Sequence, residues 1–443
     1  MPKENASLVI KAGWIIPVIP KDRVLENYAL VLQGEKIAGL LPAADVNNHY
    51  SAEQTLDLPD HVLIPGLINT HGHAAMTLLR GYADDKELMN WLNNYIWPVE
   101  GAHVDASFVE DGTSLAVAEM IRTGTTCAAD TYFFPDAAAR AFQKHHFRAQ
   151  ICMPVVKFGN AWARDEMEHI HKGLAVHDEY RSSELITSAL APHSPYTVTD
   201  DGFRKILTYA EELQIPVHLH LHETAAEIEE SIRATGRRPI ARMKDLNILS
   251  PILQAVHMTQ LTDDEIELLA LNNVQVAHCP ESNLKLASGF CPVEKLKDKG
   301  INVALGTDGA ASNNNLDMLE EMRTSALLAK ALSRDAASLR AFEILEMATI
   351  NGARLLGIEE KTGSLEAGKL ADVVAVDLGE VGLQPVYHPD SHLVYSATGH
   401  QVSHVWINGR MLLEQGEYTD LDAKRLYHVA NEWKEKILGR KRT

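Results

Sequence analysis

The stretch VLIPGLINTHGH occupies residues 62–73 and places two histidines two positions apart, directly after an apolar run. Alternate residues of a β-strand point to the same face, so His71 and His73 can face a common centre. Far along the chain, the apolar run INVAL at 301–305 leads into the sequence GTDG, which contains Asp308. A carboxylate at the end of one strand can complete a ligand set that two histidines begin on another. Together the two stretches predict a metal site assembled from distant parts of the sequence.

Between these stretches, apolar strand candidates alternate with helical patterns. The strand candidates end near His71/His73, Asp130, Val156, His193, His220, His257, His278 and Asp308. Helical patterns lie between them, for example at 108–122, 201–213, 263–271 and 293–299. Eight strand–helix repeats over roughly 290 residues predict a (β/α)8 TIM barrel, whose active site lies at the C-terminal ends of the strands. Most of the predicted strand ends carry a histidine or an aspartate.

Both ends of the chain have a different pattern, typical of short strands joined by tight turns. Strands are predicted at 7–10, 29–32, 36–40, 372–376 and 402–407. The turn signals are Gly34 between the second and third of these strands and Asn408-Gly409 after the last. We therefore expect one small β domain assembled from both termini. The predicted domain ranges are 1–65 and 359–443 for the two β parts, the second with a C-terminal helix, and 66–358 for the barrel.

The composition narrows the classes of partner. A formal net charge of −19 argues against nucleic acid or an anionic membrane, although it leaves a small anionic ligand open. The chain shows no CxxC spacing, and its cysteines are interpreted as reduced thiols of a cytosolic protein. The first residues lack a basic-then-apolar signal pattern, and no apolar run approaches the length of a membrane span. We expect a cytoplasmic protein with a small-molecule ligand.

Strand five offers the third metal ligand. Zinc takes histidine nitrogen and carboxylate oxygen, and a catalytic zinc keeps one position for water. The sequence HLHLHE at 218–223 puts His218, His220 and His222 on one face, so alternation alone cannot choose among them. We favour His220, because Glu223 then lies just past the strand end, within reach of a substrate bound over the metal. Asp308 is the predicted fourth ligand.

The remaining strand-end residues have more than one interpretation. Glu223 could shuttle protons beside the metal, or it could cap the next helix. His257 could bind the metal or hold the attacking water, and His193 could contact a substrate heterocycle. His278 is interpreted as a supporting or structural residue rather than a ligand. Binuclear sites on such barrels need a lysine at strand four, and Lys157 instead follows strand three, so one metal is predicted.

The motifs together resemble the amidohydrolase superfamily, and most closely its 5-methylthioadenosine/S-adenosylhomocysteine deaminases. The resemblance covers about residues 7–430. It rests on THGH at 70–73, APHSPY at 191–196, HLHET at 220–224, HCPESNLKLASG at 278–289 and GTDGAASNN at 306–314. It implies a urease-like β-sandwich beside the barrel, a homo-oligomer, and hydrolytic deamination of an adenine nucleoside to the inosine analogue and ammonia.

The resemblance also implies roles for single residues. One zinc ion per chain would be bound by His71, His73, His220 and Asp308. Glu223 and Asp308 would handle protons, and His257 would position the attacking water. In the substrate, Glu100 would hold the ribose hydroxyls, Trp91 would cover the 5′ side and His193 would hold the purine.

One departure from the family pattern bears on the substrate. Members that accept S-adenosylhomocysteine carry two arginines after strand three, whereas residues 153–165 offer only Arg164 together with Lys157. The uncharged methylthio compound is therefore favoured. The alternatives are a guanine-type deaminase or a triazine chlorohydrolase, which have no ribose for Glu100 to hold. A more remote alternative is a non-catalytic scaffold like the dihydropyrimidinase-related proteins, which have lost metal ligands that this chain keeps.

Overall fold

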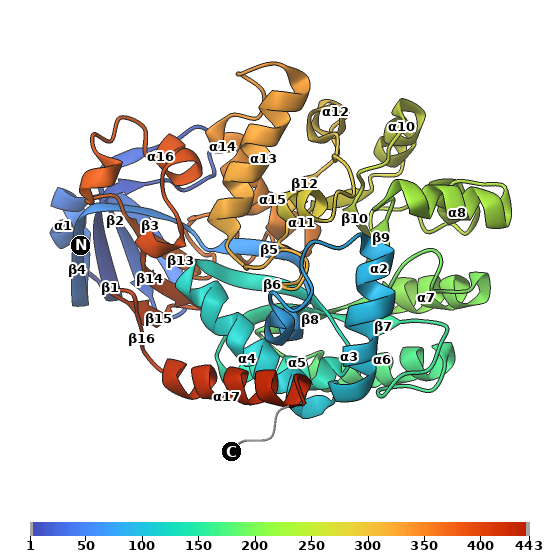
Figure 1. The fold of residues 1–443 in the computed structure, drawn as a ribbon. Coiled ribbons are helices and arrows are strands. Elements are labelled where there is room, and N and C mark those ends of the chain that lie inside the picture. Colours follow the sequence, from blue (N-terminus) through green and yellow to red (C-terminus); the bar gives the residue numbers. More distant parts are fainter. Residues whose placement is uncertain (1–2, 440–443) are drawn as a thin grey trace. The chain divides into compact units, whose positions relative to one another are not determined.

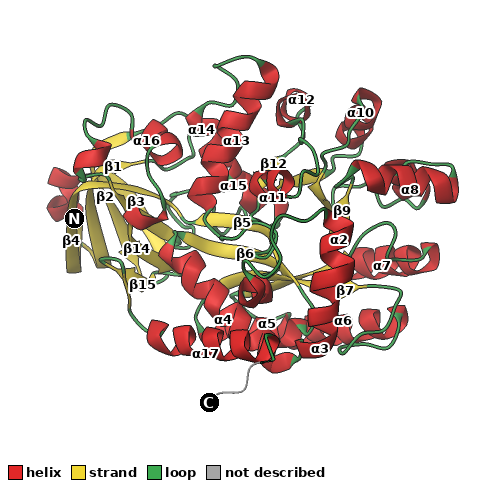
Figure 2. Cartoon of the chain, in the orientation of Figure 1, coloured by secondary structure: helices red, strands yellow, loops and turns green. Residues whose placement is uncertain are grey.

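A computed structural model describes residues 3–439, which form two β-sheets and the helices that accompany them (Figures 1 and 2). Within these residues, eight parallel strands form a nearly closed barrel in chain order. They are β5 (Leu67–Gly72), β6 (Thr125–Thr131), β7 (Arg148–Val155), β8 (Ile186–Pro192), β9 (Val217–Leu221), β10 (Leu253–His257), β11 (Gln275–His278) and β12 (Val303–Leu305). The predicted (β/α)8 fold is confirmed.

Helices follow the barrel strands, and α7, α8, α10 and α12 lie on the outer side of them (Figure 1). The helices of this part are α2 (Leu88–Trp91), η3 (Leu92–Ile96), α3 (Trp97–His103), α4 (Ala106–Arg122), α5 (Pro135–Lys144), α6 (Glu166–Tyr180), α7 (Asp200–Leu213), α8 (Ala225–Thr235), α9 (Pro239–Asp245), α10 (Asp263–Leu271), α11 (Pro280–Lys285) and α12 (Val293–Asp298). Side-chain caps start several of them. Thr199 accepts a hydrogen bond from the Gly202 amide at the start of α7, and Thr262 and Glu265 form a capping box on α10.

The other sheet combines both ends of the chain, as predicted. Its strand order is β16-β15-β14-β13-β4-β1-β2-β3. The strands are β1 (Glu4–Ile15), β2 (Leu25–Gln33), β3 (Lys36–Pro42), β4 (Tyr50–Pro65), β13 (Val373–Asp377), β14 (Val402–Ile407), β15 (Arg410–Glu414) and β16 (Glu417–Tyr418). β4 and β13 join the two ends in an antiparallel pair, with Ile64 opposite Val374. One buried core of this sheet takes Leu63 from the N-terminal part and Trp406 from the C-terminal part.

Turn chemistry explains two of the hairpins in this sheet. Gly34 has φ +60° between β2 and β3, and Asn408 and Gly409 have φ +50° and +72° between β14 and β15. Positive φ at both central residues is the geometry of a type I′ turn, which Asn-Gly adopts at little cost. Both turns were predicted from the sequence.

The apolar run at 62–68 is divided between the two sheets. β4 ends at Pro65 and β5 begins at Leu67, with Gly66 at the junction. A Cβ atom on Gly66 would lie 1.9 Å from Oγ1 of Thr126, so no larger residue fits there without movement. The first part of β4, residues 50–61, is mostly exposed and polar, which is why the sequence pattern did not predict it.

The remaining helices complete the described chain. They are η1 (Ala43–Asp45), α1 (Val46–His49), η2 (Ala74–Leu79), α13 (Met318–Ser333), α14 (Ala341–Met347), α15 (Ile350–Leu355), η4 (Val381–Leu383), α16 (Pro389–Tyr395), η5 (Gly399–Gln401) and α17 (Ala423–Ile437). Across residues 3–439, no helix has both the length and the apolar character needed to cross a membrane.

The described chain divides into two compact units. One comprises the residues up to Asn69 together with Glu119–Cys127 and Asp317–Leu421, and the other comprises Thr70–Ala118, Ala128–Leu316 and the residues from Asp422 onward. In the second unit, Trp433 of α17 packs edge-on against Phe108 of α4. These units are defined by how the chain packs, and their limits do not test the predicted domain ranges. The domain boundaries predicted at 65/66 and 358/359 stay a prediction.

Candidate active site

His71 of β5 and His73, which directly follows that strand, direct their Nε2 atoms toward one carboxylate. Nε2 of His71 lies 3.4 Å, and Nε2 of His73 lies 3.2 Å, from Oδ1 of Asp308. Nδ1 of His73 donates to the carbonyl oxygen of Thr131 at 2.5 Å, at the end of the neighbouring β6. Nδ1 of His71 is instead 2.8 Å from Nε2 of His218. The pair predicted from THGH therefore meets the aspartate predicted from GTDG.

Asp308 is held by hydrogen bonds to both of its oxygens. Oδ1 accepts from the amide of Gly309 at 2.8 Å, and Oδ2 accepts from the hydroxyls of Ser282 at 2.6 Å and Ser312 at 2.9 Å. The backbone of Asp308 has φ +63°, a left-handed conformation that non-glycine residues rarely adopt. Strained backbone of this kind persists where the surrounding structure fixes it, and it clusters at functional sites.

The structure distinguishes among His218, His220 and His222, which lie in or directly after the fifth barrel strand, β9. The sequence pattern could not choose among these three as the metal ligand. Nε2 of His220 lies 3.1 Å from Nε2 of His71, and its Nδ1 donates to the carbonyl oxygen of His193 at 2.8 Å. His222 turns away at a backbone φ of +55°, and its ring bonds to the carbonyl oxygen of Gln260 and the amide of Ile240. Of the three, His220 is the one whose ring joins the group around Asp308.

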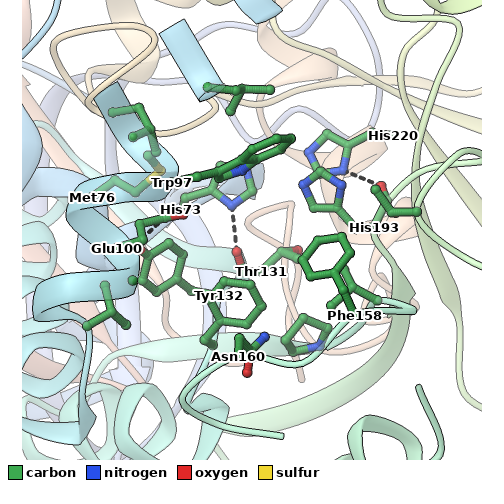
Figure 3. A pocket seen from close by; sticks show the side chains of 18 of the residues that line it. His73, Met76, Trp97, Glu100, Thr131, Tyr132, Phe158, Asn160, His193 and His220 are labelled. Carbon is green, nitrogen blue, oxygen red and sulfur yellow. Dashed lines mark hydrogen bonds between the residues drawn. The ribbon is translucent and has the colours of Figure 1, made fainter. Parts of the chain in front are cut away.

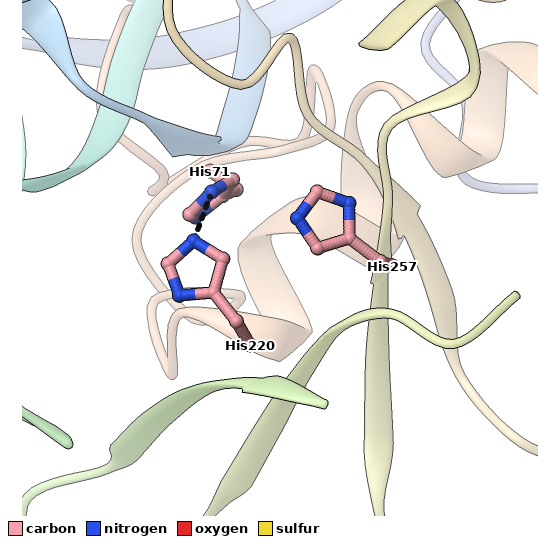
Figure 4. A group of neighbouring side chains, drawn as sticks. All are labelled: His71, His220 and His257. Carbon is pink, nitrogen blue, oxygen red and sulfur yellow. Dashed lines mark hydrogen bonds between the residues drawn. The ribbon is translucent and has the colours of Figure 1, made fainter. Parts of the chain in front are cut away.

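His257, at the end of β10, also belongs to this group (Figure 4). Its Nδ1 donates to Oδ1 of Asn283 at 2.9 Å, and its Nε2 faces Oε1 of Glu223 at 3.9 Å. The rings of His71, His220 and His257 each place a nitrogen within 4.8 Å of the others, and His71, His73 and Asp308 do the same. The geometry thus brings together every predicted ligand, with His257 beside them.

The electrostatics of the cluster follow from burial and from Asp308. Burial holds the pKa of His71 and of His220 well below the usual value, so both rings are neutral. Burial also acts on His73, but its hydrogen bond to Asp308 and the charge of that group raise its pKa to about 9. Burial would raise the pKa of Asp308, but the nearby rings of His71 and His73 hold that pKa well below the ordinary range.

The donor set suits a zinc ion. Imidazole nitrogen and carboxylate oxygen are ligands that Zn²⁺ prefers, and ligating histidines usually donate their other ring N–H to an oxygen. His73, His220 and His257 do so through Nδ1, which leaves Nε2 as the ring nitrogen that would bind a metal. The fourth barrel strand, β8, ends at Pro192 with no lysine in it, so the bridging group of a binuclear site is missing there.

Glu223 lies at the mouth of the cluster rather than at a helix cap. Thr224 is the N-cap of α8, since its side chain accepts a hydrogen bond from the amide of Glu227. The carboxylate of Glu227 in turn accepts from the amides of His222 at 3.2 Å and Glu223 at 2.7 Å, which fixes the turn. The Glu223 side chain is thereby free of capping and lines the cavity. Burial raises the pKa of Glu223.

The cluster opens into a cavity of ≈ 750 Å³. Besides His73, His193, His220, Glu223, His257 and Asp308, the walls are largely apolar, with Leu88, Trp91, Leu92, Ile96, Trp97, Tyr132, Phe133, Phe158, Trp162 and Tyr196. Figure 3 shows Glu100 and Tyr132 on one side of the cavity and His193 and His220 on the other. A pocket with an apolar wall and a few convergent polar groups is typical of small-molecule binding.

Glu100 is a partly buried carboxylate in an otherwise aromatic wall. It lies on α3, and its Oε1 accepts a hydrogen bond of 2.6 Å from the hydroxyl of Tyr132, which follows β6. Burial raises the pKa of Glu100 to about 7, although the bond from Tyr132 acts in the opposite direction. Trp91, the last residue of α2, lines the same wall.

The other predicted site residues lie in different surroundings. His193 lies half-buried in the cavity wall with its ring 4.7 Å from that of His220, and desolvation lowers its pKa to about 4. Arg164 lines the cavity edge, but 86% of its side chain is exposed and its Nε donates to Oε2 of Glu168 at 2.7 Å. Lys157 donates to the carbonyl oxygen of Tyr196 at 2.9 Å. His278 is buried and is not part of the cavity wall.

Several residues of the site were not predicted. Tyr132 directly follows a barrel strand, and that position was the available signal for it. Asn283 was seen only as part of a motif, and its contact with His257 depends on the fold. Asn160 shapes the loop after β7, where its Oδ1 accepts from the amides of Trp162 and Ala163. Loop residues of this kind carry no periodic signal.

Fold and site together define a hydrolase-type barrel with a metal-binding cluster at its strand ends, and comparison with known proteins gives the family. The family model described as the amidohydrolase family matches residues 62–412. The chain belongs to the amidohydrolase family, as predicted.

Relatives match along nearly the whole chain. A 5-methylthioadenosine/S-adenosylhomocysteine deaminase of Teredinibacter turnerae is 49% identical over 98% of both chains. A 5′-deoxyadenosine deaminase of Methanosarcina barkeri is 38% identical over 98% of this chain and 99% of its own. Among solved structures, an adenosine deaminase from Xanthomonas campestris with bound zinc superposes with a TM-score of 0.98 at 47% identity, covering 99% of this chain and 100% of that one.

Proposed function

We propose that this chain is a zinc-dependent aminohydrolase that deaminates the adenine ring of 5′-methylthioadenosine, giving the inosine analogue and ammonia. S-adenosylhomocysteine and adenosine are weaker substrates in this proposal. The names of the relatives at 49% and 38% identity support an adenine nucleoside with a modified 5′ position. The cavity adds the residues that would recognise it.

The observation that carries the proposal is the pairing of Glu100 with Tyr132. A carboxylate in an aromatic wall needs donors, and Tyr132 supplies one to Oε1 at 2.6 Å. The remaining lone pairs can accept from the 2′- and 3′-hydroxyls of a ribose. A free base or a triazine has no such hydroxyls and would leave the charge of Glu100 without these partners, which is costly in a low-dielectric site. The residue therefore favours nucleosides.

His71, His73, His220 and Asp308 would hold one zinc ion, with His257 beside it. A zinc ion bound there would lower the pKa of a water molecule from about 15.7 to about 7. His257 donates through Nδ1 to Asn283 and so presents an Nε2 lone pair that can orient that water. The oxygens of Asp308 can accept its proton, while Ser282 and Ser312 keep the carboxylate in place.

Glu223 is the acid of the proposed reaction. Its raised pKa favours a protonated carboxyl group, which can donate to the ring nitrogen beside the carbon under attack. Water adds to that carbon and gives one proton to Asp308, which passes it to the exocyclic amine. The C–N bond then breaks, ammonia leaves, and the proton of the remaining hydroxyl returns to Glu223 as the ring carbonyl forms. His193, neutral at pH 7, would contact the purine.

The preference for a methylthio tail rests on the outer wall. Trp91, Trp97 and Phe158 offer apolar surface to a thioether, and Arg164 already pairs with Glu168. A homocysteine tail would bring a carboxylate and an ammonium group to this wall. Desolvating them without matched partners costs binding energy.

The test is a substrate comparison on one preparation. Methylthioadenosine, adenosine, S-adenosylhomocysteine, adenine and guanine would be offered in turn, and kcat/KM followed by the ultraviolet change on deamination. Methylthioadenosine should be the best substrate. If adenine or guanine is best, a free-base deaminase replaces the proposal, and a protein that binds zinc but turns over none of them would support a scaffold. A cytoplasmic location and a homo-oligomeric state belong to the same proposal.

A further inference from the structure

His218 lies inside the barrel, two residues before His220 on β9, and links His71, a proposed zinc ligand, to Gln254, which the proposed reaction does not use. Its Nε2 is 2.8 Å from Nδ1 of His71, and the two rings are inclined by only 22°. Its Nδ1 is 2.9 Å from Oε1 of Gln254, which stands opposite it on β10. All three side chains are buried, with exposed fractions of 0–1%.

His71 differs from the other histidines of the cluster in what its Nδ1 contacts. His73 and His220 donate to backbone carbonyl oxygens, and His257 donates to an amide oxygen. A carbonyl oxygen can only accept, so it fixes the proton on Nδ1 and leaves Nε2 as the lone-pair donor to a metal. An imidazole nitrogen can donate or accept, so the partner of His71 does not by itself fix its tautomer.

Gln254 removes this ambiguity. Its Oε1 can only accept, so Nδ1 of His218 carries a proton. A neutral imidazole has one N–H, which leaves Nε2 of His218 as an acceptor. Nδ1 of His71 must then donate to it, and the lone pair of His71 is on Nε2, which lies 3.1 Å from Nε2 of His220 and 3.4 Å from Oδ1 of Asp308.

We infer that His218, held by Gln254, is a positioning residue that fixes His71 in the tautomer able to bind the metal. The inference rests on the proposed function for the presence of the metal. Gln254 acts only through His218, and His218 acts only through His71. Outer contacts to metal-binding histidines typically change metal affinity 10–100-fold when they are lost.

The experiment measures zinc affinity rather than turnover. The full chain is stripped of metal, and its zinc Kd is determined by competition with a chromogenic chelator. His218→Leu and Gln254→Leu should each raise Kd, by about 10–100-fold for the first and somewhat less for the second. Because both act through one contact, the double variant should bind no more weakly than His218→Leu alone. His218→Gln, whose amide oxygen can accept from His71, should restore most of the affinity.

The matched control is His222→Leu. It removes another buried histidine from the same segment, one whose ring bonds to Gln260 and Ile240 instead of to the cluster. Its zinc Kd should stay within about twofold of the parent, while its thermal stability falls through the lost hydrogen bonds. Circular dichroism of the metal-free proteins checks the fold. If His218→Leu does not fold, Gln254→Leu, which leaves His218 in place, decides the outcome.

Different results overturn different statements. Unchanged zinc affinity in Gln254→Leu and His218→Leu overturns the positioning role and leaves the proposed function intact. Additive losses in the double variant, or an equal loss in His222→Leu, also overturn it, since both indicate general loosening. A parent protein that binds no zinc overturns the proposed function itself. A parent that binds zinc but does not deaminate nucleosides overturns the substrate assignment while the tautomer argument stands.

Discussion

The two ends of the cavity are built in different ways. At the inner end, His71, His220 and His257 stand on the strands of one barrel, and hydrogen bonds hold each ring. At the outer end, the wall comes from the short helices α2, η3 and α3 and from the loop after β7, with Trp97 and Phe158 exposed by 37% and 45%. Rigid strands suit groups that must meet one metal, whereas loops can vary with the substrate tail.

The largest expected effect lies at the inner end. His220→Ala removes a proposed zinc ligand whose Nε2 lies 3.1 Å from Nε2 of His71. Both bound zinc and deamination should be lost, while the barrel stays folded. Metal analysis of the parent should give a ratio near one zinc per chain. A ratio near two would contradict the single-metal site and direct attention to Lys157.

Glu223→Gln should give the next largest effect. A glutamine keeps the shape but cannot carry the acid proton, so kcat should fall by roughly 10²–10⁴, the usual contribution of a general acid–base group. Zinc content and thermal stability should remain those of the parent, because Thr224 and not Glu223 caps α8. Near-normal turnover together with a lowered Tm would return Glu223 to a structural role.

The outer half of the site is tested by Glu100→Ala. Hydrogen bonds to a charged group contribute roughly 1.5–3 kcal/mol each, so two ribose hydroxyls justify a preference for nucleosides over free bases on the order of 10² or more. The variant should lose most of that preference by losing activity on nucleosides selectively. The measurement is the ratio of kcat/KM for methylthioadenosine and adenine, with Tyr132→Phe as an intermediate case. A ratio that survives Glu100→Ala would refute the ribose contact.

The same contrast decides what could be predicted from the sequence. His71, His73 and Asp308 were predictable because strand alternation and strand ends determine where they point. His220 needed the additional position of Glu223, since His218 and His222 share its spacing. The relation of His218 to Gln254 could not be predicted, because it depends on the register between β9 and β10.

The outer wall was predicted mainly through family resemblance. Trp91 and Glu100 lie on the short helices α2 and α3, and with η3 between them these helices look like one ordinary amphipathic stretch. Tyr132, which fixes Glu100, comes from a strand end some thirty residues later, and only the fold brings the two together. Non-local contacts of this kind leave no local pattern in the sequence.

A pH titration gives a smaller effect that still separates the two ends. Burial raises the pKa of Glu100 to about 7, above its ordinary value of 4.5, so the carboxylate form is lost as pH falls through 7. The preference for nucleosides over free bases should therefore be greatest above pH 7. Below pH 7 it should fall, approaching a tenfold decrease for each pH unit. The measurement is the ratio of kcat/KM for methylthioadenosine to that for adenine. In this ratio, the pH dependence of groups that act on both substrates cancels. Glu100→Gln should make this ratio independent of pH.

The smallest expected effect is at Arg164. Its side chain is 86% exposed and its Nε bonds to Glu168. An uncharged tail has no group that would pair with this guanidinium. Arg164→Ala should leave kcat/KM for methylthioadenosine within about twofold, because exposed ion pairs contribute little. Arg140→Ala, which breaks a similar i,i+4 pair with Asp136 on α5, is the matched control.

Glu168→Gln sharpens the test, because it releases Arg164 from its partner. If the homocysteine carboxylate can reach that guanidinium, S-adenosylhomocysteine should then gain severalfold while methylthioadenosine does not change. A large loss on methylthioadenosine in Arg164→Ala would instead show that the loop after β7 closes over the substrate, and the outer wall would then be as tightly determined as the inner end.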